Sequence, residues 1–530
     1  MMSTLTAREL RPAVLQLCKR GNYHDAVQVV VAFMGKGYLD FDAARICMEA
    51  CKRQNDVPQM KALSEASVRF APSNWRSWQL KYQAEYSDAR WADAFLSLEK
   101  IASLAKDLNA EHYIAKADVY LRLLEPEKSL SELEKVTDLS DPSVLNRYRD
   151  LKARTHFQHR QYDLVIKELE GWLETSSDDV IAVSGWKLLG KSLDAQGEYD
   201  KAFGAFQNGN AMQLRLSKNV FSDNSLRKRI EVFRSLFSRQ WVESWTKTTP
   251  PAVTPVFMIG FPRSGTTLLE QIVDAHPSVQ AMEEPPTIST VLRQASALMQ
   301  SIAQLEGSLK GKVGWKSQWQ TVMSYIAKLT DEQVGALRDT YFKVAAQEVN
   351  LKKGGMLIEK MPLDTVDIGL ILRLFPQARF VVSLRHPADC VLSGYMQNFK
   401  VTDAMANFLD LDNAASFYKH VMKLLWQYEE VFDLKGRMHY IRYEDLVMDL
   451  EGEARKVLDF LGLPWDGAVL NYDEHAKQRG TLATPSYQGV TQKIYDSSRE
   501  RWRHYAQWME PVLPHFREAA ERYGYDLTIK

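Results

Sequence analysis

Residues 255–277 of this 530-residue chain read PVFMIGFPRSGTTLLEQIVDAHP. The apolar run 256–260 predicts a buried strand. A short loop over residues 260–267 follows and is bounded by Gly260 and Gly265. Apolar residues then recur at helical spacing: Leu268, Leu269, Ile272 and Val273. We therefore expect a strand, a glycine-bounded turn and a helix in immediate succession.

This order of elements is one that holds an oxyanion. Loop N–H groups and the helix N-terminus point to a common spot, where the helix dipole favours negative charge. The Gly-x4-Gly spacing is that of a phosphate-binding loop, but Thr266 occupies the position of the usual lysine. The cation lies within the loop as Arg263, whose guanidinium can bind a phosphate or a sulfonate with two donors. The alternative is an ordinary turn with a capping Thr266-Thr267 pair.

The composition is that of an ordinary globular protein, with 45% hydrophobic and 25% charged residues. Lys+Arg and Asp+Glu both number 67, so the net charge gives no reason to expect nonspecific binding to nucleic acid. No run of about 18 apolar residues predicts a membrane span, and the N-terminal residues carry charges where a leader would be apolar. We expect a cytoplasmic protein. Four cysteines are too few for a disulfide framework, and Cys47 and Cys51 are expected to be core residues of a helix.

The first part of the chain repeats with a regular period. The clearest unit matches the tetratricopeptide consensus, W-x2-L-G followed by G-x-Y-x2-A-x3-F, over residues 186–206. The tyrosine position of that consensus recurs upstream at steps of 37, 36, 35, 34 and 34 residues, and the six register positions are Tyr199, Tyr162, Pro126, Trp91, Val57 and Tyr23. We therefore predict an N-terminal α-solenoid of about six tetratricopeptide-like helix pairs.

The predicted domains are a repeat domain over residues 1–215, a helical linker over 216–250 and an α/β domain over 251–530. The linker ends at Thr248-Thr249-Pro250-Pro251, where two prolines break the helical pattern. Repeat arrays form concave surfaces that bind peptides or other proteins. Recognition of such a partner is one alternative for the array, and bracing the second half of the chain is the other. The sequence favours neither.

Two carboxylates, Glu283 and Glu284, follow the loop by one helix and one turn. The prolines after them fix the backbone, and a return of the chain to the sheet edge would bring the pair near the loop. A carboxylate at that edge can act as a general base, whereas the alternative is solvated surface charge. His276 is a rival base, although a histidine before a proline at a helix end more often forms a cap or turn.

Two further strands each end in a cation. Residues 356–359 lead to Lys360, and residues 379–384 lead to Arg385. Helices separate these strands, so they predict a parallel sheet, whose ligands bind at the carboxyl ends of the strands. Together with Arg263, three strand-end cations favour a polyanionic ligand with separated charges. Another strand is expected near 438–442, and the basic, aromatic segment 484–505 is either a surface loop or a flap over a nucleotide.

Residues 250–530 resemble the sulfotransferases that use 3′-phosphoadenosine 5′-phosphosulfate (PAPS). The likeness is greatest to the tyrosylprotein sulfotransferase type, in the bacterial architecture with an N-terminal tetratricopeptide array. Four strings carry it in the expected order: PRSGTTLLEQIVDAHPSV, EKMPLDTVDIGLILRLFPQARFVVSLRHPADCVLSGYMQNF, RYEDLV and VTQKIYDSSRERWRHY. The resemblance implies a P-loop-like α/β domain with a parallel sheet.

The resemblance also implies which residues bind the nucleotide. The 5′-phosphosulfate would be held by the loop residues Arg263, Ser264, Gly265, Thr266 and Thr267. Arg385 and Ser393 would hold the 3′-phosphate, and Tyr443 would touch the adenine. In the C-terminal flap, Gln492 and Lys493 would contact the nucleotide, although related bacterial sequences tend to have proline where this chain has Lys493.

For the chemistry, the resemblance assigns Glu284 as the general base. Lys360 falls where a lysine stabilises the transferring group and the leaving oxygen, Arg263 lies at the same group, and Ser486 matches a serine that assists. These roles imply in-line sulfuryl transfer from PAPS to an acceptor hydroxyl, leaving 3′-phosphoadenosine 5′-phosphate (PAP). No metal is expected, because arginine, lysine and backbone amides carry the positive charge.

Two other functions are alternatives. A kinase or NTPase with a modified loop would need a lysine after Gly265 and a strand-end aspartate for magnesium, where this chain has Thr266 and strand-end cations. A non-catalytic repeat scaffold would have lost the loop arginine, the lysine or the carboxylate, and the chain retains all three. The acceptor is left open among a peptide tyrosine, a sugar, a lipid and a small phenol.

Overall fold

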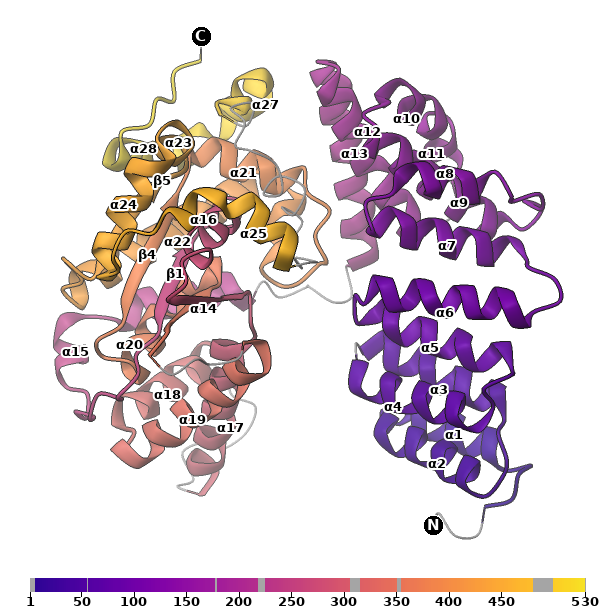
Figure 1. Ribbon diagram of the computed structural model, residues 1–530. Helices are drawn as coiled ribbons and strands as arrows, with labels where there is room; N and C mark the ends of the chain where they lie inside the picture. The colour runs from indigo at the N-terminus through magenta and orange to yellow at the C-terminus, as the bar shows by residue number, and fades with distance from the viewer. Residues whose placement is uncertain are drawn as a thin grey trace. The chain divides into compact units, whose positions relative to one another are not determined.

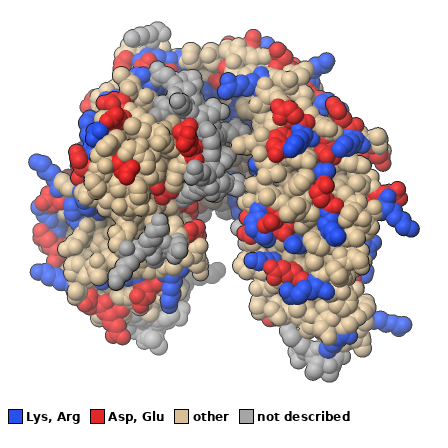
Figure 2. Space-filling model, in the orientation of Figure 1, with Lys and Arg blue, Asp and Glu red and all other residues tan. Residues whose placement is uncertain are grey.

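The chain forms a helical unit, residues 1–198, and an α/β unit, residues 199–530, in the computed structural model (Figure 1). The structure describes residues 5–54, 56–176, 179–217, 225–305, 315–349, 354–479 and 499–529. Acidic and basic side chains are interspersed over the face of each unit seen in Figure 2, in keeping with the balanced charge of the sequence. Among the described residues, no helix combines the length and the apolar character needed to cross a bilayer.

The helical unit consists of short helices that pack on their neighbours one and two places along the chain, as α1 does on α2 and α3. Cys47 and Cys51 are buried in its core, as expected. The helices of this unit are α1 (Leu10–Lys19), α2 (Tyr23–Gly35), α3 (Phe41–Gln54), α4 (Val57–Phe70), α5 (Trp75–Ser87), α6 (Trp91–Leu104), α7 (Ala110–Arg122), α8 (Pro126–Leu133), α9 (Pro142–Gln158), α10 (Tyr162–Leu169), α11 (Trp172–Thr175) and α12 (Asp179–Ala195).

The predicted register positions coincide with helix starts. Each of the six is the first residue of a helix, at α2, α4, α6, α8, α10 and α13 (Tyr199–Ser217). The period read from the sequence therefore marks real structural boundaries in the chain. The assignment of these pairs to the tetratricopeptide class, and their stacking as a solenoid, stay predictions.

Helix α13 belongs to the α/β unit, whereas the sequence placed it in the repeat domain that ends at residue 215. Its Phe203 stacks on Trp508 with ring centroids 4.3 Å apart and on Tyr395 at 5.4 Å. Its Asn210 donates a hydrogen bond of 3.1 Å to the Tyr395 carbonyl. The repeat pattern predicts that this segment is a helix but does not predict the unit on which it packs. The aromatic face of the helix packs on the rest of the α/β unit. The three domain limits as such stay predictions.

The segment predicted as a linker, residues 216–250, also contributes to the α/β unit. It contains α14 (Ser225–Leu236) and α15 (Arg239–Glu243), and between them Phe237 is only 2% exposed. The Phe237 ring fills the space that a side chain on Gly369 would need, because a Cβ built there would lie 2.2 Å from the ring. Phe237 also packs edge-on against Tyr428 at 4.9 Å.

The α/β unit is organised around a five-stranded parallel sheet with strand order β2-β3-β1-β4-β5. The central strand is buried along its whole length, as is typical of a parallel sheet covered on both faces. The strands are β1 (Val256–Gly260), β2 (Val279–Glu283), β3 (Met356–Lys360), β4 (Arg379–Leu384) and β5 (Met438–Arg442). The strands predicted near 256, 356, 379 and 438 are confirmed, and β2 is an addition that the sequence did not predict.

Alternate side chains of the central strands enter two separate layers of core, because successive strand residues point to opposite faces. Met258 belongs to the cluster formed with α16 (Thr266–Asp274) and α24 (Leu450–Leu461). Phe257 faces the other way, towards Tyr341 and Phe375, with ring centroids about 6 Å away, at 6.2 and 6.0 Å. Both faces of the sheet are therefore closed, and its carboxyl edge is left for function.

The remaining helical elements of the unit surround this sheet (Figure 1). One predicted helix, 446–461, is divided at Asp449, whose side chain caps the second part by accepting from the Gly452 N–H. These elements are α17 (Thr287–Leu305), α18 (Trp315–Lys328), α19 (Asp331–Glu348), η1 (Pro362–Asp367), α20 (Ile368–Leu374), α21 (Pro387–Tyr395), η2 (Met405–Leu409), α22 (Leu411–Val431), α23 (Tyr443–Met448), η3 (Gly467–Asn471), α25 (Tyr472–Arg479), η5 (Arg501–Tyr505), α27 (Ala506–Met509), η6 (Glu510–His515) and α28 (Arg517–Tyr523).

Replacing Phe237 by alanine tests whether residues 225–245 are an integral part of the α/β unit. Phe237→Ala removes a buried ring, so we expect the free energy of unfolding to fall by about 3–5 kcal/mol. Calorimetric unfolding of the full chain measures the change. The control Val253→Ala alters a side chain that is 54% exposed and should change stability by less than about 0.5 kcal/mol. Equal effects of the two substitutions would contradict the packing described here.

Candidate functional site

Five strand ends meet at the carboxyl edge of the sheet. Gly260 of β1 pairs in register with Ser383 of β4, and Met258 pairs with Lys360 of β3. On the far side of β3, Glu283 is the register partner of Lys360. The strand-end residues that the sequence singled out therefore lie along one edge, as predicted for parallel strands.

The loop after β1 is held in an unusual backbone conformation. Arg263 has φ of 71° and Gly265 has φ of 97°, both in the left-handed region. A Cβ on Gly265 would lie 2.7 Å from the ring of Tyr443, so that ring packs directly on the loop glycine. A non-glycine residue at positive φ is strained, and such strain persists only where the surrounding structure enforces it. The contacts around Arg263 hold its backbone in this conformation.

Two hydroxyl groups anchor the loop from neighbouring strands and turns. The Ser383 Oγ donates a hydrogen bond of 2.8 Å to the Ser264 carbonyl. The Gly260 N–H donates to Thr365 Oγ1 at 3.1 Å, and that hydroxyl lies 2.8 Å from the Gly260 carbonyl. Ser383 and Thr365 are buried, and the sequence reasoning missed both. Ser383 is the penultimate residue of a predicted strand, whereas Thr365 lies in η1, after β3, where the sequence carried no such signal.

Arg263 and Arg385 meet at one end of the site. The Arg263 Nε donates to the Ser393 Oγ at 3.1 Å, and an Arg385 guanidinium N–H donates to the Arg263 carbonyl at 3.2 Å. The Arg385 guanidinium lies over the Tyr443 ring, 5.0 Å from its centroid. The structure thus brings together four residues predicted for nucleotide binding, although Ser393 contacts Arg263 where the resemblance grouped it with Arg385.

Lys360 lies among carboxylates at the other end of the site. Its Nζ is 3.0 Å from Glu284 Oε1, 3.3 Å from Glu270 Oε2 and 3.9 Å from Glu283 Oε1. The side chains of Lys360 and Glu270 are both 0% exposed, whereas that of Glu283 is 10% and that of Glu284 40% exposed. The carboxylate open to solvent is therefore Glu284, and an incoming substrate would meet it first.

Glu284 is also held in a strained conformation, with φ of 49°. Its backbone N–H donates to the Lys360 carbonyl at 2.8 Å, so the residue just after β2 continues the pairing with β3. The rival base His276 is engaged elsewhere, because its Nδ1 accepts from the Ser278 N–H and its Nε2 lies 3.0 Å from the Pro464 carbonyl. His276 therefore forms a turn, in line with the expectation for a histidine before proline.

Three predicted site residues lie outside the described residues: Ser486, Gln492 and Lys493. Glu270 is the opposite case, a residue at the site that the sequence reasoning missed. It lies one helical turn after Thr266, on the same face of α16, and is buried. A charged residue on an otherwise apolar, buried stripe was the signal, because such a residue is almost always paired.

Behind Lys360, on the opposite face of β3, Glu359 is buried among polar groups. It accepts a hydrogen bond from Thr287 and interacts with Tyr341 and Asp364. Burial raises the pKa of Glu359 to about 7 and raises the pKa of Asp364 well above its ordinary value. Two adjacent carboxyls in an apolar interior cannot both ionise cheaply, so the pair retains a proton near neutral pH.

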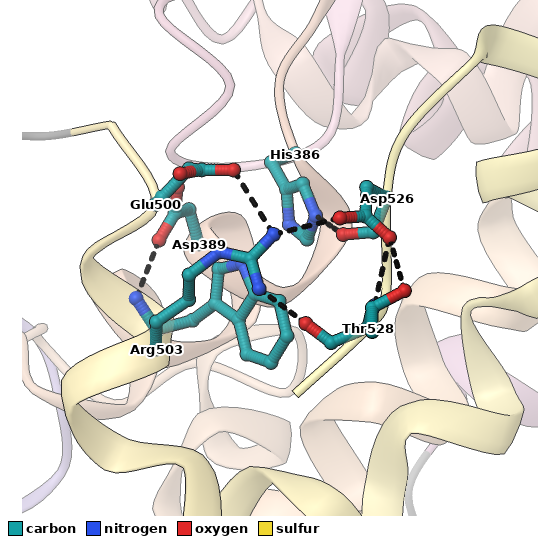
Figure 3. A network of polar contacts seen from close by, with 7 residues as sticks. His386, Asp389, Glu500, Arg503, Asp526 and Thr528 are labelled. Atoms are coloured by element: carbon teal, nitrogen blue, oxygen red, sulfur yellow. Dashed lines mark hydrogen bonds and ion pairs between the residues drawn. The ribbon is translucent and has the colours of Figure 1, made fainter. Parts of the chain in front are cut away.

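The C-terminal segment secures the start of α21, which follows Arg385 directly (Figure 3). His386 stacks on Trp502 at 5.3 Å and its Nε2 lies 3.0 Å from the Asp526 carbonyl. Asp389 accepts from the Trp502 N–H at 2.9 Å. Arg503 closes the network with ion pairs of 3.1 Å to Glu500 and 3.0 Å to Asp526. The helix that carries Ser393 is thereby fixed in place.

The arrangement fits a ligand with two separated anionic groups. The N-terminus of α16, with Thr266 and Thr267, faces the loop, and the Ser264 hydroxyl is buried with no hydrogen-bond partner among the described residues. That hydroxyl is a donor available to an oxyanion. Among the described residues, no group of His, Cys, Asp and Glu side chains is placed to hold a metal ion.

Comparison with known proteins gives a family for this region. A model described as the sulfotransferase family matches residues 255–467. An uncharacterized protein of Aquifex aeolicus is 25% identical over 418 residues, 78% of this chain and 52% of the relative. Protein-tyrosine sulfotransferase 1 of Danio rerio is 26% identical over 242 residues, 45% of this chain and 61% of the relative.

The protein-tyrosine sulfotransferase of Drosophila melanogaster is 28% identical over 221 residues, 41% of this chain and 40% of the relative. The chain therefore spans roughly half the length of these curated relatives, between 40% and 61%. Among solved structures, the sulfotransferase domain of the Synechococcus PCC 7002 olefin synthase aligns over 53% of this chain and 100% of its own, with 21% identity and a TM-score of 0.35.

The buried Glu359 predicts a pH dependence of stability. The pKa of Glu359 is about 7 in the folded chain against an ordinary 4.5. The contribution of Glu359 to the free energy of unfolding is therefore fully present below pH 4.5 and is lost as the pH rises through 7. Glu359→Gln removes this loss, and the variant should gain on the order of 3 kcal/mol relative to the wild type between pH 5 and pH 8. Urea unfolding at several pH values measures the difference. The control Glu348→Gln, an exposed position on α19, should show a difference that does not vary with pH.

Proposed function

Because residues 255–467 belong to the sulfotransferase family, we propose that this chain transfers a sulfuryl group from PAPS to an acceptor hydroxyl by in-line displacement. The observation that carries the proposal is the placement of Arg263 with Arg385 at one end of the sheet edge and of Lys360 with Glu284 at the other. Two clusters of charge, one mostly cationic and one that pairs a lysine with a carboxylate, suit a doubly anionic donor and a hydroxyl acceptor.

The binding roles follow the geometry. Arg263 and the backbone N–H groups of residues 264–267 bind the 5′-phosphosulfate at the N-terminus of α16. Arg385 and Ser393 bind the 3′-phosphate, and the contact of both with Arg263 links the two anion subsites. Tyr443, which lies against Gly265 and Arg385, bounds the space for the adenine. Gln492 and Lys493 complete the nucleotide site in this proposal.

The catalytic roles rest on the cluster around Lys360. PAPS supplies an activated sulfonate, and the chain has to place fixed positive charge on its oxygens and accept the acceptor's proton. Glu284, the exposed carboxylate, takes that proton as the acceptor oxygen attacks sulfur. Lys360 and Arg263 stabilise the charge that develops on the transferring and leaving oxygens, and each such donor is worth about 3 kcal/mol. Ser486 assists at the leaving oxygen.

The acceptor and the role of the helical unit extend the proposal. Relatives named protein-tyrosine sulfotransferases favour a peptide tyrosine as the acceptor. The helical unit holds a groove of about 1460 Å³ lined by residues of α5, α7 and α9, among them Tyr82, Tyr86 and Arg154. A groove of this size supports binding of a protein or peptide partner over a purely bracing role. We therefore assign partner recognition to the repeat array and catalysis to the α/β unit.

Binding of PAP without magnesium tests the nucleotide site. Isothermal titration should detect binding in the presence of a chelator, because arginine, lysine and backbone amides neutralise the phosphates. Arg263→Ala should weaken that binding by at least about a hundredfold, since it removes a charged donor that is fixed in the loop. A strict magnesium requirement would indicate a kinase or NTPase, and unchanged affinity in Arg263→Ala would remove the central assignment.

Substitution of the two adjacent carboxylates tests the general base. Glu284→Gln should retain PAP binding and lose turnover by about a hundredfold or more, because it removes the carboxylate proposed to take the acceptor proton. Transfer of radiolabelled sulfonate from PAPS to acceptors in a cell extract measures turnover. Glu283→Gln is the matched control and should keep most activity. The reverse pattern would make Glu283 the base.

A further inference from the structure

The proposed reaction uses one of the carboxylates at Lys360 and leaves Glu270 without a role. Glu270 lies 3.3 Å from the Lys360 Nζ, and both side chains are 0% exposed. Burying an ion costs several kcal/mol unless a partner of opposite charge compensates it. Among the described residues, Lys360 is an ion-pair partner that compensates the charge of Glu270.

The position of Glu270 links the two halves of the site. Glu270 is on α16, one turn after Thr266, where the helix begins at the phosphate-binding loop. Lys360 is the last residue of β3, next to the strand end that carries Glu283. The Glu270–Lys360 ion pair thus connects the loop helix to the strand end across the carboxyl edge.

The donors of the lysine can be counted. An ammonium group has three N–H donors and accepts none. The Lys360 Nζ donates one hydrogen bond, of 3.0 Å, to Glu284 Oε1. Glu270 Oε2, at 3.3 Å, and Glu283 Oε1, at 3.9 Å, act on the ammonium as ion-pair partners through their charge. The hydrogen bond to Glu284 and the closer ion pair with Glu270 together set the direction in which the remaining Lys360 donors point.

We propose that Glu270 is a positioning residue that holds the Lys360 ammonium so that its remaining donors face the transferable sulfonate. This inference rests on the proposed sulfuryl transfer. It also gives Glu270 a task during the reaction. Once Glu284 has accepted the acceptor's proton it is neutral and holds Lys360 less tightly, whereas Glu270 takes no part in the proton transfer and its contact keeps the ammonium in place.

The proposal separates two ligands that differ only in the transferable group. PAPS carries the sulfonate that Lys360 faces, and PAP lacks it. If the Lys360 ammonium is no longer held toward the sulfonate, PAPS binding should therefore weaken and PAP binding should stay unchanged. A simple electrostatic effect has the opposite sign, because removing a negative charge near the site would strengthen the binding of an anion. The direction of the change thus distinguishes positioning from bulk charge.

The experiment measures dissociation constants of the full-length protein for PAP and PAPS by isothermal titration. We expect Glu270→Gln to weaken PAPS binding about tenfold, because the buried ion pair that holds the Lys360 ammonium is lost, with PAP affinity within twofold of the wild type. Glu283→Gln is the matched control, since it removes one charge from the same cluster at a longer distance from the Lys360 Nζ, 3.9 Å. It should not weaken PAPS binding.

A double substitution tests whether Glu270 acts through Lys360. In the Lys360→Met background, adding Glu270→Gln should change PAPS affinity by less than about twofold, because the group to be positioned is gone. Additive losses, a gain in PAPS affinity, or loss of PAP binding in Glu270→Gln would each overturn the proposal. Failure of the wild type to bind either nucleotide would instead reject the sulfotransferase function, so the two results are distinguishable.

Discussion

Parallel pairing of β1 with β3 on one side and β4 on the other is the constraint on which the site depends. The pairing sets Met258 beside Lys360 and Gly260 beside Ser383, so residues more than a hundred positions apart in the sequence reach the same edge. Parallel strands cannot be joined by tight turns, and the crossover helices that join them cover both faces of the sheet. The carboxyl edge is then where backbone groups and charges can meet a ligand.

Along this edge, charge is arranged by burial. Arg263 and Arg385 are linked through a backbone carbonyl and lie near Tyr443, a surrounding that favours an external anion. Lys360 is fully buried and has carboxylate partners of its own, so its charge is compensated before any ligand arrives. In the proposed reaction the arginines bind the ligand, and the lysine acts beside the proposed base, Glu284. The two groups also differ in solvent access, since Lys360 is fully buried and both arginines are half-buried.

Much of this could be predicted from the sequence, for reasons that particular residues make clear. Strands β1, β3 and β4 are mostly apolar, and a cation lies at or shortly after the end of each: Arg263, Lys360 and Arg385. The helix starts in the first unit follow a regular period. Strand β2, VQAME, mixes polar and apolar residues, so only Glu283 and the Glu284 that follows it attracted notice. Glu270 was missed because helical periodicity describes an apolar stripe and gives no role to a charge within it. The repeat pattern placed α13 correctly as a helix, but the aromatic stacking of Phe203 that assigns it to the second unit depends on tertiary contacts.

The left-handed backbone at Arg263 and Glu284 has a consequence for how this domain can change. Both residues keep a conformation that glycine or asparagine adopts at lower cost, at φ of 71° and 49°. Selection for thermal stability alone would therefore tend to replace the two side chains on which the proposed chemistry depends. If a more stable descendant of this domain retains arginine and glutamate at these positions, selection for activity has kept them. If it has glycine there, the domain is no longer under selection for the proposed reaction.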